Sequence, residues 1–250
     1  MRDRILRIGK SDLEVSDERM KSLMNDMTNA KTPGYQKSEI VTRAFPLELQ
    51  SAMDRINSRS STGPMEPKIE GTFYNRIKGS LVNTGSKLDT ALGGDGYFCL
   101  YGPGGEIYTR DGRFTLDPNG NLLSVAGEYP ILGEGGPINL SSAEDVTINQ
   151  NGEIMINDEK VAKLRIVKIE NPDALEPLTG SFYQGDSEVL MVEEDLNPRV
   201  VQGYVETSNV SVVDQMMELM YLSQKYQITT KVVQARDSGL AAAMQLGSTQ

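Results

Sequence analysis

Apolar residues near the N-terminus recur with a helical period. Leu6, Leu13, Met20 and Met27 fall every seven residues, which is the spacing of one face of a helix. The face is narrow, because the positions near Gly9 are not apolar. This pattern predicts an N-terminal helix with a thin apolar seam.

Local signals place the ends of this helix. Ser11 opens a Ser-Asp-Leu-Glu stretch that fits a capping box, so in one interpretation the helix starts there. In the other it starts earlier and includes Gly9, at a cost of about 1 kcal/mol relative to alanine. Both versions end near Asn29, because Pro33 disfavours a helical backbone at the residue before it and Gly34 permits a tight turn.

The middle of the chain is a run of short strand-like segments separated by turn signals. The clearest signals are Asp111-Gly112, Asn119-Gly120 and Asn151-Gly152. Each is flanked by β-branched, aromatic or aliphatic residues, a pattern that predicts antiparallel hairpins. At the last turn, Val146 and Ile148 are expected to lie opposite Ile154 and Ile156.

The C-terminal part predicts one long helix. Ser211 and Asp214 form a start signal, no proline follows, and Gly247 is a natural stop. About 35 helical residues reach roughly 50 Å, a length typical of a coiled coil or an assembly. The apolar stripe of this helix consists of Leu219, Leu222, Tyr226 and Val233. Three neighbouring methionines, interpreted as packing residues that widen it, are Met216, Met217 and Met220.

These elements predict an α+β fold with four parts. Residues 1–35 hold the first helix and its exit turn, and residues 36–78 form a partly irregular linker in which 45–56 fit a short helix. Residues 79–200 form a mainly antiparallel β domain, and residues 201–250 hold the long helix. The two terminal helices are expected to pair as a coiled-coil-like segment.

Charge is distributed unevenly. The net charge is −10, and residues 61–200 carry 11 Lys and Arg against 22 Asp and Glu. An acidic middle argues against nucleic-acid binding, which requires a basic face. No run of 18 apolar residues is present, so no membrane insertion is expected. The N-terminus lacks the apolar region of a cleavable secretory signal.

Residue types limit the chemistry further. The chain has no histidine, which removes Ser–His and Cys–His catalysis and the commonest zinc ligand. Cys99 is the only cysteine, lies in an apolar run and is expected to be buried and inert.

Acidic clusters give no stronger sign of a site. Asp89, Asp95 and Asp111 suggest a hydrolase carboxylate pair, but no pattern brings them together. The stretch 117–121 reads as a hairpin turn and not as a calcium loop. No catalytic residue, metal or cofactor is therefore predicted.

Three blocks resemble the flagellar axial proteins, the family of rod, hook and hook-associated subunits. The first, "NDMTNAKTPGYQKS", is similar to the family's "NNxANxxTxGY/F" signature. The second is "GSLVNTGSKLDTALGGDGYFCL" followed by "YTRDGRFTLDPNGNLL", and the third is "VQGYVETSNVSVVDQMMELM". The blocks occur in the family's order, and the chain length is most like the rod subgroup of FlgG and FlgF. Asp26 and Thr28 depart from the family's usual Asn and Ala.

The resemblance implies a structural subunit and not an enzyme. Such subunits leave the cell through the flagellar type III export apparatus without a cleaved signal peptide, and they build a hollow rod across the periplasm with copies of themselves and neighbouring rod or hook proteins. The terminal helices line that tube. A periplasmic carboxylate-dependent hydrolase or a cell-wall-binding module is the alternative.

The resemblance also explains the abrupt exit from the first helix, as the place where the chain turns towards the β domain. Asn25, Asn29 and Thr32 are expected to bond freed backbone groups there, and Asn209 or Ser211 is expected to cap the last helix. The residues expected to serve assembly are Asn25, Asn29, Thr32, Pro33, Gly34, Tyr35, Ser208, Asn209, Val210, Leu219, Leu222, Tyr226 and Val233.

Overall fold

The computed structural model describes residues 2–46, 65–140, 146–186 and 189–247. The chain divides into two compact units. The helical unit comprises Met1–Thr28, Ser38–Tyr74 and Ser211–Gln250. The β unit comprises Asn29–Lys37 and Asn75–Val210.

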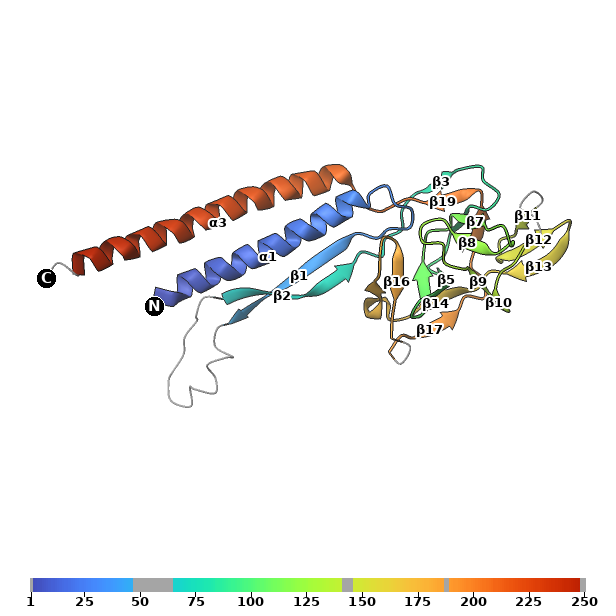
Figure 1. The fold of residues 1–250 in the computed structure, drawn as a ribbon, viewed down its shortest axis with the longest axis horizontal. Helices are drawn as coiled ribbons and strands as arrows, with labels where there is room; N and C mark the ends of the chain where they lie inside the picture. Colours follow the sequence, from blue (N-terminus) through green and yellow to red (C-terminus); the bar gives the residue numbers. More distant parts are fainter. Residues whose placement is uncertain (1, 47–64, 141–145, 187–188, 248–250) are drawn as a thin grey trace. The chain divides into compact units, whose positions relative to one another are not determined.

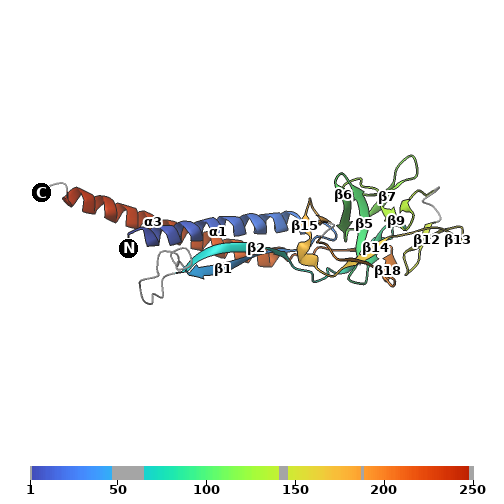
Figure 2. The ribbon, with the colours of Figure 1, turned by 90° about the horizontal axis from the view of Figure 1, so that it is seen from below.

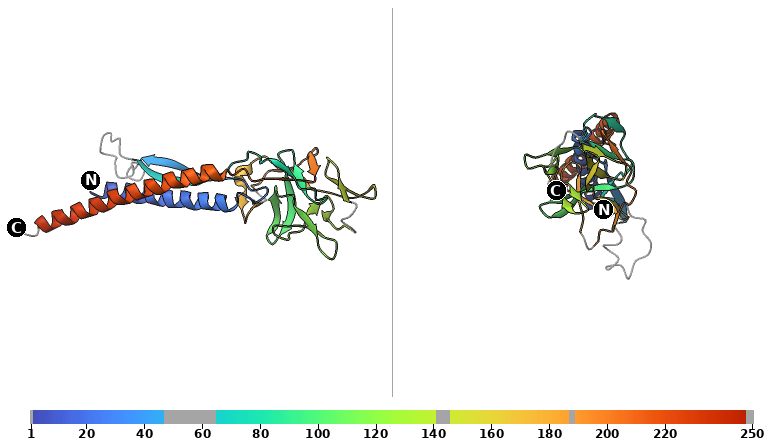
Figure 3. Two further views of the ribbon diagram at one scale, coloured as in Figure 1. Left: turned by 90° about the horizontal axis from the view of Figure 1, so that it is seen from above. Right: turned by 90° about the vertical axis from the view of Figure 1, so that its right-hand side faces the viewer.

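The helical unit contains two antiparallel helices and a two-stranded ribbon. Its elements are α1 (Arg2–Thr28), β1 (Ser38–Pro46), β2 (Met65–Tyr74) and α3 (Val212–Gly247). The helices lie side by side and run in opposite directions (Figures 1 and 3). The ribbon of β1 and β2 packs along α1 (Figure 2).

Two sequence interpretations change in this unit, and the alternative of a longer helix that includes Gly9 is confirmed. The helix does not start at Ser11 but runs through it, and the Ser11 hydroxyl donates instead to the Pro67 carbonyl. Gly9 lies inside α1, where an added Cβ would come within 2.8 Å of Val233 Cγ2, so the glycine allows the helices to approach closely. The described parts of the predicted linker 36–78 form two long paired strands, and most of the stretch 45–56 lies outside the described residues.

The β unit is mainly antiparallel, as predicted. Its largest sheet has the order β15-β16-β6-β5-β14-β17. These strands are β5 (Tyr97–Gly102), β6 (Gly105–Thr109), β14 (Ile166–Ile169), β15 (Glu176–Pro177), β16 (Phe182–Gln184) and β17 (Val192–Glu194), with a short 3-10 helix η1 (Pro172–Ala174) before β15.

Smaller sheets complete the unit. They are β11-β12-β13 and the pairs β3-β19, β4-β18, β7-β8 and β9-β10. Their bounds are β3 (Leu81–Asn83), β4 (Thr90–Leu92), β7 (Phe114–Leu116), β8 (Leu122–Ser124), β9 (Leu132–Gly133), β10 (Gly136–Pro137), β11 (Val146–Ile148), β12 (Glu153–Ile156), β13 (Glu159–Lys163), β18 (Val200–Gln202) and β19 (Tyr204–Glu206).

Two of the three predicted hairpins form. Asn119-Gly120 joins β7 to β8, and Asn151-Gly152 joins β11 to β12 in the expected register, with Val146 opposite Ile156. Asp111-Gly112 is not a hairpin turn, because β6 and β7 on either side of it belong to different sheets. One hydrophobic core fills the unit and includes Phe98, Leu100, Ile107, Phe114, Leu122, Ile131, Ile154 and Phe182.

Candidate assembly site

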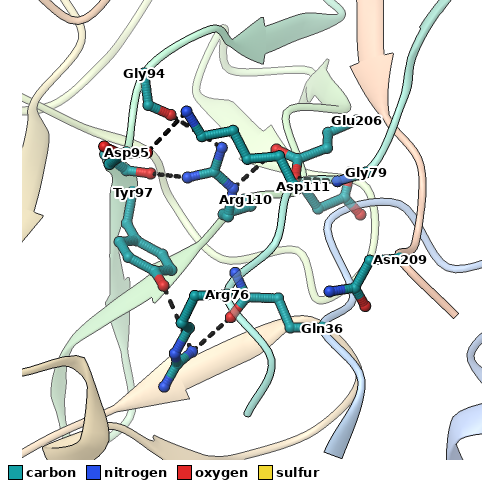
Figure 4. Close-up of polar contacts among 12 residues, drawn as sticks. Gln36, Arg76, Gly79, Gly94, Asp95, Tyr97, Arg110, Asp111, Glu206 and Asn209 are labelled. Atoms are coloured by element: carbon teal, nitrogen blue, oxygen red, sulfur yellow. Dashed lines mark hydrogen bonds and ion pairs between the residues drawn. The ribbon is translucent and has the colours of Figure 1, made fainter.

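Three segments that are far apart in sequence meet in one polar junction of the β unit (Figure 4). They are the exit turn 29–37, the stretch 75–79 and the stretch 206–210. In the exit turn, the Thr32 amide donates to the Asn29 carbonyl at 2.9 Å, and the Thr32 hydroxyl donates to the Asn29 side-chain oxygen at 3.2 Å. These bonds hold the exit turn together, and the expectation that the side chains of Asn29 and Thr32 bond freed backbone groups stays a prediction.

Gly34 brings two signature blocks into direct contact. Its φ is +69°, a left-handed conformation that favours glycine. An added Cβ would lie 2.4 Å from the Asp111 amide nitrogen, so a larger residue cannot fit without displacing the backbone. The Gly34 amide donates to the Glu206 carbonyl at 2.9 Å, which ties the exit turn to the third block.

Asn209 joins all three segments with one carboxamide. Its side-chain oxygen accepts from the Lys37 amide at 2.7 Å, and its side-chain nitrogen donates to the carbonyls of Asn75 and Ile77 at 2.9 and 2.7 Å. Asn209 is therefore not the helix cap that the sequence offered as one option. Ser211 takes that place, because its hydroxyl accepts from the Asp214 amide at 3.4 Å.

A buried ion pair between Arg110 and Glu206 stabilises the junction. The side chains of Arg110 and Glu206 are each 3% exposed and lie 2.8 Å apart. Arg110 also donates to the carbonyls of Gly96 and Gly94, and its guanidinium lies 5.7 Å from the ring centre of Tyr97. Removing one partner of such a pair leaves a buried charge and typically costs about 3–5 kcal/mol.

Sequence reasoning missed this ion pair as a functional feature. Arg110 and Glu206 both lie inside the family blocks, in "YTRDG" and "ETSNV". Their position in those blocks was the sequence feature from which a functional role could have been predicted. Nothing in the linear spacing of 96 residues indicated that the two side chains would meet.

The three aspartates considered as hydrolase carboxylates engage different partners. Asp111 pairs with Arg113 at 2.7 Å, and Asp95 pairs with Lys78 at 2.7 Å. The hydrogen bond from Lys78 holds the pKa of Asp95 below its usual value. Asp89 accepts from the Thr84 hydroxyl at 2.7 Å. Among the described residues, no group of three or more His, Cys, Asp or Glu is placed to hold a metal ion.

In the helical unit, the predicted stripe of α3 faces α1. Leu222 is 2% exposed, while Leu219 and Val233 are half-buried. Polar contacts continue the same face, because Asp12 of α1 pairs with Lys225 at 2.6 Å and accepts from the Thr229 hydroxyl at 3.1 Å. The sequence therefore identified the side of α3 that packs within the chain, and Tyr226 lies at its border with 37% exposure.

A second apolar stripe runs along the opposite side of α3. At 100° per residue, its members lie about 80° to 180° around the helix axis from Leu222, with Val213 and Met220 on the far side. We call this set the outer stripe, and it consists of Val213, Met217, Met220, Tyr221, Ile228 and Val232, which are 53–66% exposed. Within the chain the three methionines do not pack against α1, because Met216, Met217 and Met220 are all more than half exposed.

The remaining residues predicted to serve assembly lie near the end of α1, in the exit turn and next to Asn209. Asn25 is exposed near the end of α1, whereas Pro33 is half-buried and Tyr35 is buried in the exit turn. Ser208 and Val210 flank Asn209, and the Ser208 hydroxyl accepts from the Val210 amide at 3.2 Å. Within the described ranges, neither helix combines the length and apolarity that a membrane span requires.

Comparison with known proteins shows which family the chain resembles. The family model "Flagellar basal body rod FlgEFG protein C-terminal" matches residues 201–246, and "Flagellar hook protein FlgE/F/G D1 domain" matches residues 91–156. These ranges contain Asn209, Arg110 and Glu206, so much of the junction is built from family-model segments.

Individual relatives match most of the chain. The flagellar basal-body rod protein FlgF of Rhizobium meliloti is 28% identical over 92% of this chain and 91% of its own length. FlgG of Buchnera aphidicola subsp. Schizaphis graminum is 28% identical over 96% and 98%, and FlgF of Salmonella typhimurium is 29% identical over 89% of both chains. Over about nine-tenths of its length, the chain is therefore similar to flagellar basal-body rod proteins.

Proposed function

We propose that this chain is a structural subunit that polymerises into the hollow helical rod of the flagellar basal body. Copies of itself and neighbouring rod or hook proteins are its partners, and its place is the periplasm. The observation that carries the proposal is the outer stripe of α3, together with the relatives that are named as basal-body rod proteins.

In an isolated chain, the exposed side chains of the outer stripe do not contribute the free energy that their burial would provide. Burial of each large aliphatic side chain contributes about 1.5–3 kcal/mol, and soluble monomers rarely expose contiguous apolar patches of this extent. A helix that is apolar on two opposite sides is typically covered on both. The inner side of α3 is covered by α1, so the outer stripe is left for another subunit.

The two different apolar sides of α3 are also compatible with the growth of a polymer. A face that binds a different surface on the next copy gives an open helical filament when the rotation does not close. The terminal helices then pair in a coiled-coil-like manner with those of neighbouring subunits. The junction around Asn209 and Arg110 keeps the exit and entry segments of the β unit together during assembly.

Export and chemistry follow from the same proposal. The subunit reaches its place through the flagellar type III export apparatus, without cleavage of a signal peptide and without a cofactor. It acts structurally and not as an enzyme. The alternative of a carboxylate-dependent hydrolase finds no support in the site, because Asp89, Asp95 and Asp111 each engage a different partner.

The outer stripe provides the test. Met220→Asp places a charge in the stripe without touching the face that packs on α1. In cells that lack their own copy, this variant is expected to be made and exported but to build no complete rods, as judged by electron microscopy of isolated basal bodies. Asp237→Lys changes the charge at an exposed position about 60° around the helix axis from Leu222, outside the stripe, and this control is expected to assemble. Normal rods with Met220→Asp would show that the stripe is not an assembly surface.

A further inference from the structure

A groove opens between α1 and β2 in the helical unit. Its volume is about 430 Å³. The lining residues are Arg7, Lys10, Ser11, Glu14 and Val15 of α1 and Pro67, Lys68 and Ile69 of β2. The assembly contact proposed above does not involve this groove, because the outer stripe lies on α3 whereas α1 and β2 form the groove.

The lining of the groove combines cationic and apolar side chains. Arg7, Lys10 and Lys68 contribute three positive charges, and the single carboxylate of Glu14 lies 3.7 Å from Lys10. Ile69 is 42% exposed beside them. The net positive charge and the apolar side chains of this lining fit an extended segment that carries both carboxylates and aliphatic side chains.

The chain itself supplies a segment of this kind. Lys and Arg nearly balance Asp and Glu in the helical unit, at 13 against 14, whereas the β unit has 12 against 21. Within the β unit, β17 is the edge strand of the six-stranded sheet. The segment around it, residues 191–196, places exposed aliphatic and acidic side chains together.

This segment has groups available for a partner. Leu196 is 78% exposed and Met191 is 60% exposed. Glu193 is exposed and forms no ion pair or hydrogen bond within the described residues, and Glu194 is held only by Arg165 at 3.8 Å. An edge strand with an unpaired side is a common template for binding another chain.

We propose that the groove between α1 and β2 binds the β17 segment of a second copy. The proposal rests on the function proposed above and names one of its contacts. Each copy offers a groove on one unit and an acidic strand on the other, so the contact is head-to-tail and repeats along a polymer. Lys68 and Glu193 are the residues chosen to test the charge complementarity.

A peptide titration tests this pairing independently of polymer growth. A fluorescent peptide of residues 189–197, VLMVEEDLN, is titrated with the full chain, and its anisotropy is measured at two salt concentrations. Binding is expected to weaken with salt, and Lys68→Glu is expected to weaken it about fivefold or more. Lys21→Glu, on α1 outside the groove, should leave binding unchanged. Absence of peptide binding, or equal binding by Lys68→Glu, overturns the proposal.

Charge exchange then tests whether two copies are involved. Lys68→Glu and Glu193→Lys chains are each expected to associate less than the wild type in sedimentation velocity, and their equimolar mixture is expected to recover. The Glu159→Lys chain controls for a charge change elsewhere in the β unit. Recovery only when both changes are in one chain would mean a contact within the chain and overturns the proposal.

The two experiments separate this inference from the proposed function. Peptide binding that follows the charges in a chain that never forms rods would leave the groove assignment standing and remove the rod function. Polyphosphate is titrated in parallel as a polyanion. If polyphosphate binds through Lys68 and the peptide does not, the groove takes an anionic polymer, and the strand assignment fails.

Discussion

Asn209 shows how a single side chain can hold together three segments that are distant in the sequence. Its carboxamide uses one acceptor and two donor positions on three different backbone groups. Aspartate, which has nearly the same shape, offers only acceptors when ionised. The requirement at this position is therefore for both donors and acceptors, which explains why an amide and not a carboxylate occupies it.

Replacement of Asn209 should destabilise the β unit. Asn209→Ala removes three hydrogen bonds, and we expect a loss of about 2–3 kcal/mol, because partly buried backbone groups lose their partners. Asn209→Asp should cost at least as much, since a carboxylate oxygen then faces the carbonyls of Asn75 and Ile77. Urea unfolding of the full chain measures both, and Asn119→Ala on an exposed turn is the control. An aspartate variant as stable as wild type would contradict this role.

Cys99 illustrates the effect of burial on a thiol. Burial raises its pKa from an ordinary value of 9.0 to about 12. The native thiol should therefore stay protonated and unreactive to a thiol reagent at pH 8.5, and it should react on unfolding in urea. Because the unfolded thiol ionises first, its contribution to stability is present below pH 9 and is lost between pH 9 and about 12. Rapid labelling of the folded chain at pH 8.5 would contradict this.

At the scale of elements, the sequence pattern correctly predicted features that depend on local sequence alone. The side of α3 around Leu222, here called the inner stripe, and the hairpin at Asn151-Gly152 were predicted from spacing and turn chemistry. Leu222 is buried, and Val146 lies opposite Ile156 as expected. Gly247 is the last described residue of α3, so the stop there stays a prediction. The outer stripe was missed because apolar residues surround α3, so that spacing alone does not say which side is covered.

Tertiary contacts explain the other differences. The capping-box signal at Ser11 was overridden, because its hydroxyl bonds to β2 and the helix continues past Gly9 against α3. The strands β1 and β2 were read as linker, since Pro67 and Gly71 interrupt the second one. Their pairing and their contact with α1 could not be inferred from local pattern.

The inner stripe gives a sharp test at this scale. Leu222→Asp places a charge in a position that is 2% exposed against α1, so the helical unit should lose several kcal/mol and rod assembly should fail. The thermal transition of the β unit should barely change, because Leu222 does not belong to its core. Far-UV circular dichroism follows the helices, and reaction of the buried Cys99 thiol with a thiol reagent reports melting of the β unit.

The control for that test is Tyr221→Asp, one residue away in the outer stripe. It should preserve the helix pair in the isolated chain while still preventing assembly, because Tyr221 is 66% exposed. If Leu222→Asp also melts the β unit, α3 contributes to a single shared core, and the description of two units is wrong.

At the scale of the whole molecule, the two units differ in what holds them together. The β unit has a large core of fully buried residues drawn from several sheets. In the helical unit, the buried apolar side chains of the described part are Val15, Leu23 and Leu222. Of its helices, α3 also carries the exposed outer stripe, which the rod function proposed above would bury against other subunits.

This difference predicts the behaviour of the isolated chain under limited proteolysis. The helical unit opens at lower cost, because local opening is governed by the buried contacts that must be broken. Cleavage should therefore begin within residues 1–28 and 212–250 and leave a resistant fragment near residues 75–210, identified by mass spectrometry. Addition of assembled rods of the same chain should not protect the free form, but incorporation into them should protect both ends, since the outer stripe is then covered. Early cleavage within residues 97–138, with intact termini, would reverse the assignment of the β unit as the self-sufficient part.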